Sequence, residues 1–390
     1  MDGVYETLRG LLLAAESAAP GSSVDTAVAR LADQVGARQA GFWVVDLTGR
    51  AVLRLTTAGT EDRLDKPASV PLEGSDYQAA LTGLRPRLIE DAERGGFRMI
   101  APVTHRGDAI GLLELGWAGP PSAGVMGQVA AAAHMLAYLL IADQRFTDRY
   151  TWGKPIRPRS LAAEIQRNLL PPSLSCQATQ FSLCGHVEPS GGASGDTFDY
   201  ALDSEALFLS VTDPMGHDMA AAVAASVLTG AVRQARGSGA DLLTQAARID
   251  EALLHHDEGH ATGQLLRINL TDGATQFVNA GHPWPFRLRD GHPQEIPCHI
   301  DQPFGLPFPH TYRLQHLDLR PGDRLVFFTD GMLERGSTSL NLPSLLTATH
   351  RLRPREAALA LTAAAVEANA GVLEDDATAV CLDWHGTPPH

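Results

Sequence analysis

Six short apolar segments between residues 181 and 384 constrain the fold of this chain more than any other feature. Helical patterns interrupt them at residues 219–235, 239–255 and 345–370. Runs of this length, rich in Val, Ile and Phe and bounded by turn-forming residues, are typical of β-strands. The sequence therefore predicts an α+β domain whose strands are mostly antiparallel. The six segments are FSLCGHV, EALFLSVTD, GQLLRINL, TQFVNAGH, DRLVFFTD and DATAVCLDW.

A smaller α+β domain is predicted ahead of these segments, over residues 15–145. Its pattern is an amphipathic helix, two pairs of apolar runs that we interpret as β-hairpins, and a closing helix. The closing helix is apolar on nearly every face, which indicates burial against a sheet or a partner. The expected elements are a helix at 24–36, hairpins at 41–59 and 97–117 that turn at 46–50 and 105–108, and the closing helix at 127–145.

Residues 146–172 are predicted to form a helical linker between the two domains. Polar residues and prolines fill its first half. The motif LAAEIQRNLLPP then places Leu161, Ile165 and Leu169 on one face of a short helix that the two prolines end. The second domain is accordingly expected over residues 173–386.

Composition narrows the class of protein. The chain has 390 residues, a number that suits two domains, and its net charge of −14 argues against nucleic acid as a partner. The four cysteines are scattered and contain no CxxC pair, which favours a reducing compartment over a disulfide framework. The N-terminus lacks the basic leader of a signal peptide. The longest apolar stretch, 129–142, falls short of the about 20 residues that a membrane span needs, so we expect a cytoplasmic protein with no membrane partner.

Four aspartates share one local context in the second domain. Asp196 lies in SGDTFDY, Asp213 ends the strand segment LFLSVTD, Asp330 ends RLVFFTD, and Asp375 lies in the turn before ATAVCLDW. Any one of these, beside glycine or proline at a strand end, is more often a plain turn residue. Together they indicate something else, because strands that share one core would bring their carboxylates to the same place.

Carboxylates gathered in this way require a cation. Like charges a few ångströms apart raise each other's pKa and destabilise the fold unless something neutralises them. Oxygen ligands without clustered His or Cys favour hard ions such as Mg²⁺ or Mn²⁺. Two such ions held by shared carboxylates can activate a water for in-line attack on phosphorus.

Residues 158 to about 385 resemble the metal-dependent PPM (PP2C-type) serine/threonine phosphatases. The resemblance is to the stage-II-sporulation branch, which acts on regulators of sigma factors, and it depends on the conjunction of motifs over some 220 residues. It implies a PP2C-like antiparallel β-sandwich flanked by helices. The matching stretches, in the family's order, are AEIQRNLLP, PSGGASGDTFDY, VTDPMGHDMAA, NAGHPWP, PFGLP, PGDRLVFFTDGMLE and EDDATAV.

The resemblance also implies roles for individual residues. Asp196 and Asp213 would hold a pair of Mn²⁺ or Mg²⁺ ions and carry the catalytic step, with Asp213 bridging the ions. The backbone carbonyl of Pro214 would add a ligand, and Asp330 and Asp375 would complete one ion. The implied activity is hydrolysis of phosphoserine on a regulatory protein, an anti-anti-sigma factor by family analogy.

Three positions depart from the family pattern. Asp218 stands where the GHG motif has its second glycine, Ser194 replaces the first glycine of GGD, and Phe198 replaces a tyrosine. Because all four metal carboxylates are present, we expect an active enzyme. The alternative is a catalytically silent switch of the same fold that binds a partner protein, with Asp218 marking the loss of activity.

Five further residues have a structural interpretation beside a functional one. His282 in NAGHPWP either contacts phosphate or fixes its turn, and we favour the turn. Asp376 is expected to anchor the neighbouring turn, and Asp199 to do the same for the first motif. Cys184 and Cys381 lie in apolar strands and are expected in the core.

The front domain resembles a GAF sensor domain, by element order and by the hairpin FRMIAPVTHRGDAIGLLELGW more than by any motif. A PAS-type fold is the main competitor. The resemblance implies a small-molecule ligand for this domain and regulation of the phosphatase through it, with packing of the helices at 127–145 and 161–170 as the relay. The simpler alternative is that this domain only dimerises, with the helix at 127–145 paired with its copy. A homodimer is expected on this basis.

Overall fold

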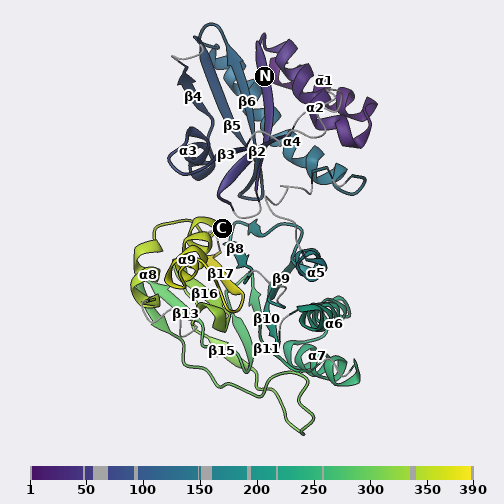
Figure 1. The fold of residues 1–390 in the computed structure, drawn as a ribbon, viewed down its shortest axis with the longest axis vertical. Helices are drawn as coiled ribbons and strands as arrows, with labels where there is room; N and C mark the ends of the chain where they lie inside the picture. The colour runs from purple at the N-terminus through teal and green to yellow at the C-terminus, as the bar shows by residue number, and fades with distance from the viewer. Residues whose placement is uncertain are drawn as a thin grey trace. The chain divides into compact units, whose positions relative to one another are not determined.

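The chain forms two compact units, Met1–Pro158 and Arg159–His390, in the computed structural model (Figure 1). Each unit is considered by itself. The structure describes residues 2–46, 49–55, 69–91, 95–147, 149–150, 160–190, 195–216, 218–256, 259–333 and 340–387.

The first unit is built on one antiparallel six-stranded sheet in the order β3-β2-β1-β6-β5-β4. Both predicted hairpins are confirmed, since β1 pairs with β2 and β5 pairs with β6. The strands are β1 (Gln39–Val45), β2 (Ala51–Leu55), β3 (Ser69–Pro71), β4 (Arg87–Glu90), β5 (Phe97–His105) and β6 (Asp108–Trp117). The helices are α1 (Asp2–Ser17), α2 (Ser23–Gln34), α3 (Asp76–Gly83) and α4 (Ala123–Asp143), with a short 3₁₀ turn η1 (Pro20–Ser22).

Helices cover both faces of this sheet. Phe42 and Val44 of β1 pack with α1, α2 and α4, while Trp43, between them in the sequence, packs on the opposite face beside Tyr77 of α3. This alternation follows from the period of two in a strand. Two helices depart from the prediction, because α1 and α3 were not expected. Since Leu11 of α1 is fully buried in the same core, the unit extends well ahead of the expected boundary at residue 15.

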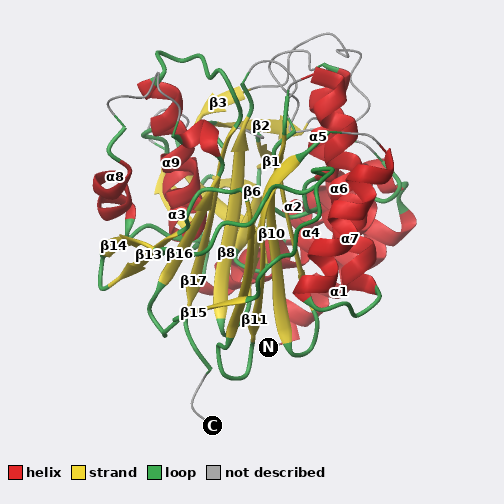
Figure 2. Cartoon of the chain, turned by 90° about the horizontal axis from the view of Figure 1, so that it is seen from below, coloured by secondary structure: helices red, strands yellow, loops and turns green. Residues whose placement is uncertain are grey.

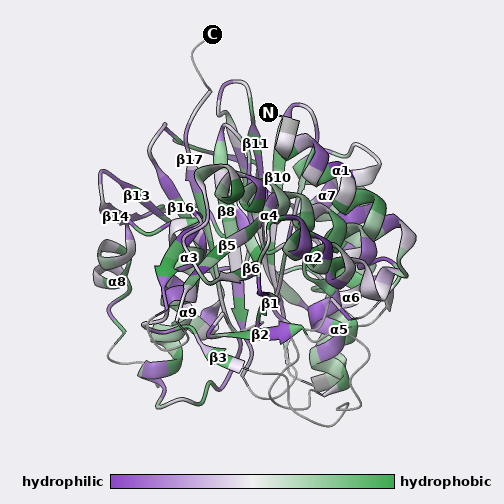
Figure 3. Ribbon diagram, turned by 90° about the horizontal axis from the view of Figure 1, so that it is seen from above, coloured by the Kyte–Doolittle hydropathy of each residue, from purple (hydrophilic) through white to green (hydrophobic). Residues whose placement is uncertain are grey.

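The closing helix α4 is hydrophobic over most of its length (Figure 3). With 21 residues it is longer than the apolar stretch 129–142, and among the described residues it is the helix long and apolar enough to span a membrane. Its face formed by Val129, Ala133, Leu136 and Leu140 instead packs into the core of the first unit. The predicted burial of this helix against a sheet is therefore confirmed. The likeness of the unit to a GAF domain stays a prediction.

The second unit contains two antiparallel sheets. The five-stranded sheet has the order β15-β12-β11-β10-β9, and the six-stranded sheet has the order β14-β13-β16-β17-β8-β7. All six strands predicted from the apolar segments are present. The strands are β7 (Ser175–Gln177), β8 (Phe181–Glu188), β9 (Thr197–Leu202), β10 (Ala206–Pro214), β11 (Ala261–Asn269), β12 (Thr275–Ala280), β13 (Phe286–Arg289), β14 (His292–Glu295), β15 (Gln315–Leu317), β16 (Arg324–Phe328) and β17 (Ala377–Trp384).

The two sheets pack face to face with helices outside them (Figure 2). Leu209 of β10 meets Phe327 of β16 and Leu382 of β17 in the core between the sheets. Two helices cover the five-stranded sheet and two cover the six-stranded sheet, which makes a four-layer sandwich. The helices of the unit are α5 (Leu161–Leu169), α6 (Asp218–Gly237), α7 (Leu242–His256), α8 (Leu342–Thr349) and α9 (Pro354–Ala368), with a 3₁₀ turn η2 (Asp330–Met332).

Two helical predictions in this unit were wrong in detail. The single helix expected at 345–370 is two helices, because Pro354 occupies the first turn of α9 and the residue before it, Arg353, is extended. The expected apolar face of α5 is also wrong, since Leu161 is 68% exposed. The buried residues of α5 are Ala162 and Gln166, and the small Ala162 packs against Ala222 of α6.

Candidate active site

The strand pairing brings the four predicted aspartates to one end of the sandwich. In the five-stranded sheet Thr197 pairs with Thr212, so Asp196 lies beside Asp213. In the six-stranded sheet Phe328 pairs with Ala379, which places the Asp330 turn beside the Asp375 turn. Each sheet thus contributes one pair of carboxylates. Hydrogen bonds from Thr329 and Thr378, which adjoin the second pair, to Asp196 show that the two pairs face one another.

Asp196 is held by hydroxyl groups from the opposite sheet. Its Oδ2 accepts hydrogen bonds from Thr329 Oγ1 (2.7 Å) and Thr378 Oγ1 (2.5 Å), and both threonines are fully buried. Burial raises the pKa of Asp196 well above its ordinary value, and the charges of Asp213 and Asp376 raise it further, against the lowering effect of the two threonines. The two hydroxyl groups therefore fix the orientation of the Asp196 carboxyl group, while burial and the neighbouring charges disfavour its ionised form.

Asp213, at the end of β10, also lies in an environment that disfavours its ionised form. Burial raises its pKa to about 8, and the charges of Asp330 and Asp375 together with a side-chain hydrogen bond to Asp330 add to the rise. Apart from burial, the groups that act most strongly on Asp213 are all carboxylates. An aspartic acid that keeps its proton near neutral pH, and lies among other acids, is a carboxyl group that a cation would return to its charged form.

A glycine allows the Asp330 and Asp375 turns to approach each other. A Cβ atom on Gly331 would lie 2.0 Å from the carbonyl oxygen of Asp376, a distance that no real side chain could adopt. Asp330 is exposed at the start of η2, and the Asp375 carboxylate accepts a hydrogen bond from the backbone N–H of Asp376 (2.8 Å). The Asp-Gly pair in TDGM is therefore needed for contact between the turns, beyond its ordinary role in a turn.

Pro214 closes β10 next to the same cluster. Its ring packs on the backbone of Gly195, where a Cβ atom would lie 2.9 Å from the proline Cγ. This contact explains the glycine before Asp196 and sets the spacing between Asp196 and Asp213. The predicted use of the Pro214 carbonyl as a ligand stays a prediction.

Asp376 anchors its surroundings, as predicted. Its Oδ1 accepts a hydrogen bond from the backbone N–H of Ser190 (2.8 Å), and its Oδ2 accepts one from Gln166 Nε2 (2.5 Å). Burial raises its pKa to about 6, the hydrogen bonds from Gln166 and Ser190 lower it, and the charge of Asp375 raises it. Asp376 is thus tied into hydrogen bonds and also contributes negative charge to the cluster.

His282 fixes its turn, and it does not face solvent. The side chain is fully buried, its Nδ1 lies 2.8 Å from Thr262 Oγ1, and its backbone N–H donates to Asn279 Oδ1. Burial lowers its pKa to about 3, so the ring is neutral. The structure therefore agrees with the interpretation that His282 fixes its turn.

Of the remaining residues of interest, the structure describes Asp199 and the two cysteines but not Ser194 or the side chain of Asp218. Asp199 forms ion pairs with Arg233 and Arg236 of α6, so it anchors the first motif as predicted. Cys184 and Cys381 are buried on paired strands, which confirms their place in the core. Ser194 and the side chain of Asp218 lie outside the described residues, so the proposed effects of these two departures stay predictions.

Sequence reasoning missed three residues that support the site. Thr329 and Thr378 orient Asp196, and Gln166 reaches both Asp376 Oδ2 and the carbonyl oxygen of Asp196 (2.9 Å). The threonines stand directly before Asp330 and two residues after Asp376 in the quoted motifs, but nothing in the sequence showed that they point at Asp196. Their role appears only once the sheets face one another.

The donor set fits hard divalent cations. The converging side chains offer carboxylate oxygens alone, which suits Mg²⁺ or Mn²⁺ better than softer metals. Among the residues described, however, no three acidic, histidine or cysteine side chains are gathered tightly enough to form a ready-made metal cage.

Comparison with known proteins agrees with the predicted family. The family model of stage II sporulation protein E (SpoIIE) matches residues 203–385. Residues 203–385 of the second unit are thus similar to the SpoIIE family. The matched stretch includes Asp213, Pro214, Asp330 and Asp375, whereas Asp196 lies ahead of it in the sequence.

Solved structures similar to this chain include three from bacteria. The PP2C phosphatase domain of SpoIIE from Bacillus subtilis, with a fragment of its regulatory domain, is 20% identical, and the match covers 54% of this chain and 66% of that one (TM-score 0.47). The RsbU and RsbW domains of a Mycobacterium tuberculosis protein are 23% identical over 57% and 63% of the two chains (TM-score 0.48). The SiaA-PP2C domain of Pseudomonas aeruginosa is 21% identical over 57% and 94% (TM-score 0.48). This chain therefore spans just under two thirds of the first two structures.

Proposed function

We propose that the SpoIIE-type domain is a metal-dependent protein serine/threonine phosphatase. The observation that carries the proposal is the convergence of Asp196 and Asp213 from one sheet with Asp330 and Asp375 from the other. Burial, together with the charges of Asp330 and Asp375, raises the pKa of Asp213 to about 8. The cluster has no use in stabilising the fold by itself, because its members repel one another. Its natural counterpart is a pair of divalent cations.

The chain's own residues would then have distinct tasks. Asp196 and Asp213 would hold the ions between them, and Asp330 and Asp375 would bind from the other sheet. Thr329 and Thr378 orient the Asp196 carboxylate before any ligand arrives, which lowers the cost of assembling the site. When bound, Mn²⁺ or Mg²⁺ supplies positive charge opposite the phosphoryl oxygens and lowers the pKa of a nearby water.

The finer parts of the proposal come from family resemblance. The substrate is phosphoserine on a regulatory protein, an anti-anti-sigma factor, and the protein acts in the cytoplasm as a homodimer. The first unit, as a GAF-like sensor with a small-molecule ligand, regulates turnover. What supports these parts is the motif match to the branch that acts on sigma-factor regulators, together with an independent core in each unit.

Hydrolysis of p-nitrophenyl phosphate by the full chain, with Mn²⁺ and with EDTA, tests the activity. We expect release of p-nitrophenol by the wild type with Mn²⁺ alone, and none by Asp330→Asn. A wild-type protein that binds Mn²⁺ without hydrolysis of this compound or of any phosphoserine peptide would favour the silent partner-binding switch. Removal of residues 1–158 then tests regulation, since unchanged turnover and unchanged regulation would contradict a sensor role for the first unit.

A further inference from the structure

A polar side chain on the buried face of α5 reaches the aspartate cluster. Gln166 is 4% exposed, and its Nε2 donates to the carbonyl oxygen of Asp196 (2.9 Å) and to Asp376 Oδ2 (2.5 Å). An amide nitrogen has two hydrogens, so these bonds use both of its donors. The two acceptors belong to opposite sheets of the sandwich, because Asp196 precedes β9 and Asp376 precedes β17.

The rest of α5 packs in a way that does not require an amide. Its neighbour on the buried face is Ala162, which packs with Ile165 against Ala222 of α6. The end of α5 is held separately, since Arg233 Nη2 of α6 donates to the carbonyl oxygen of Leu169 (2.7 Å). The amide is explained by its two acceptors.

Those acceptors determine where two carboxyl groups lie. The Asp196 carbonyl fixes the backbone from which one predicted ligand projects. Asp376 also accepts from Ser190 N–H and adjoins Asp375, the ligand predicted from the other sheet. The Gln166 side chain on α5 therefore links the backbone of Asp196, a predicted ligand from one sheet, to Asp376, the neighbour of the predicted ligand from the other sheet.

We propose that Gln166 is a positioning residue that sets the distance between the Asp196 and Asp375 halves of the site, so that the site binds metal tightly only while α5 is docked. The proposal rests on the proposed function in one respect, that the carboxylates bind divalent cations. Residues that support metal ligands from behind commonly change metal affinity by about 10- to 100-fold when substituted. Loss of the Gln166 bridge should fall in that range.

The experiment compares two methionine substitutions in the full chain. Gln166→Met keeps the length of the side chain and removes both donors, while Asn168→Met places the same residue on the exposed face of α5. Calorimetric titration with Mn²⁺ gives the dissociation constant, and turnover of p-nitrophenyl phosphate is measured in parallel. We expect Gln166→Met to raise the dissociation constant about tenfold or more, with kcat at saturating Mn²⁺ nearly kept. Asn168→Met should bind as the wild type does.

A merely structural role would give a different result. It would lower the fraction of folded protein, and thus the number of binding sites, without a change in the dissociation constant of the sites that remain. Wild-type affinity in a folded Gln166→Met protein would overturn the proposal while the phosphatase assignment stands. A wild type that binds no Mn²⁺ would overturn both.

A second variant guards against misfolding of the first. Asp376→Asn leaves one acceptor oxygen where the carboxylate has two, so it cannot keep both the Ser190 and the Gln166 hydrogen bonds. We expect weaker Mn²⁺ binding, and a combined loss smaller than the sum of the two single losses, because the two substitutions share the Gln166–Asp376 hydrogen bond. Additive losses in the double variant would overturn the proposal.

Discussion

The two ends of the strand pair β16–β17 differ in the charged groups that surround their acidic side chains. At one end, Asp330 and Asp375 join Asp196 and Asp213, and burial together with neighbouring carboxylates raises the pKa of Asp196 and of Asp213. At the other end Arg324 pairs with Asp383 across the same two strands. Acidic groups are thus crowded at both ends, and among the described residues arginines pair with those at the Arg324 end.

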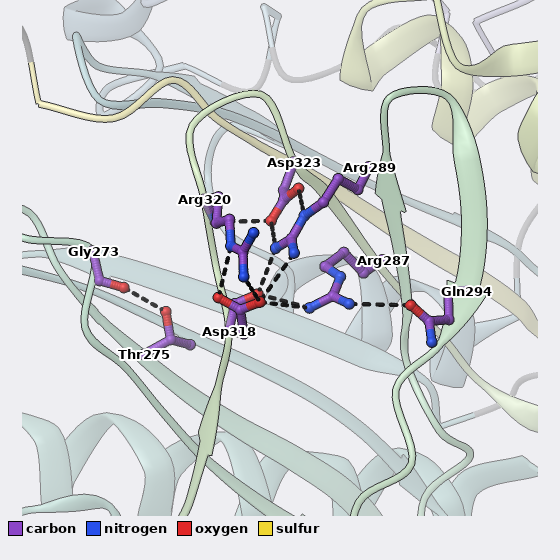
Figure 4. A network of polar contacts seen from close by, with 8 residues as sticks. All are labelled: Gly273, Thr275, Arg287, Arg289, Gln294, Asp318, Arg320 and Asp323. Carbon is purple, nitrogen blue, oxygen red and sulfur yellow. Dashed lines mark hydrogen bonds and ion pairs between the residues drawn. The ribbon is translucent and has the colours of Figure 1, made fainter.

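The balanced end continues into a wider network of ion pairs (Figure 4). Asp323 is 1% exposed and accepts from Arg289 Nε (2.8 Å) and Nη2 (2.7 Å). Three arginines surround the half-exposed Asp318, namely Arg287, Arg289 and Arg320. These contacts tie the β13–β14 hairpin to the turn between β15 and β16.

The comparison separates carboxylates that hold the fold from carboxylates that await a ligand. A buried acid with its own guanidinium stabilises the folded chain against unfolding, since removal of one partner leaves the other uncompensated. A buried acid among acids costs stability, and the chain retains that cost where a ligand recovers it. Four substitutions or conditions test this contrast, in order of decreasing effect.

Asp213→Asn should have the largest effect of the four, and we expect this effect on turnover and not as a loss of stability. The neutral amide cannot hold a cation between Asp196 and Asp330, so we expect Mn²⁺-dependent hydrolysis to fall by about 1000-fold or more, as for other essential electrostatic groups. Stability in EDTA should be unchanged or higher, because the neutral amide need not take up a proton on burial as Asp213 does near neutral pH. Urea unfolding in EDTA measures the effect on stability, and hydrolysis with Mn²⁺ measures the effect on turnover. A large loss of stability without metal would contradict the contrast.

Asp323→Asn, at the other end of the strand pair, should lower the stability of the fold and leave turnover unchanged. The amide cannot accept both guanidinium hydrogen bonds and takes from Arg289 its buried charge partner, so we expect a loss of about 2–3 kcal/mol in the free energy of unfolding. Because Arg289 is itself 26% exposed in its side chain, the loss should stay below that of a fully buried pair. Turnover per folded molecule should remain as in the wild type. Loss of Mn²⁺ affinity in this variant would show that the two ends are not separate.

The acidic half of this contrast was predictable from sequence, because it depends on local patterns. Apolar runs located the strands, and the Asp at the end of each run located the carboxylates. Thr329, Thr378 and Gln166 could not be found in this way, since each acts on a residue at least 30 positions away in the sequence. The buried face of α5 was wrong for a related reason. The partner surface at Ala222 selects the small Ala162, whereas hydrophobicity alone favoured Leu161.

Stability should fall between pH 6.5 and 8 in the absence of metal. Within this window the folded protein keeps a proton on Asp213, whose pKa is about 8, while the unfolded chain has lost it, so a rise in pH favours unfolding. Below pH 6.5 His282 opposes this trend, because its folded pKa of about 3 makes the unfolded chain the better proton acceptor.

Urea midpoints at pH 6.5, 7.2 and 8.0 in EDTA measure this slope. Saturating Mn²⁺ should remove or reverse it, since cations bind the deprotonated carboxylates more strongly as pH rises. Asp213→Asn should also flatten the slope in EDTA. Stability that rises with pH in the metal-free wild type would argue against a shared proton in the cluster.

Asp318→Asn should change least, although it removes the acid with the most arginine neighbours. Hydrogen bonds from Arg320 and Arg289 lower the pKa of Asp318, but its side chain is 52% exposed and water screens each of these pairs. We expect a urea midpoint close to that of the wild type, and any difference should shrink in about 1 M NaCl, where the screening length is about 3 Å. A loss as large as that of Asp323→Asn, and insensitive to salt, would mean that the number of ion pairs decides stability here. A small loss would mean that burial decides it, as the contrast between the two ends requires.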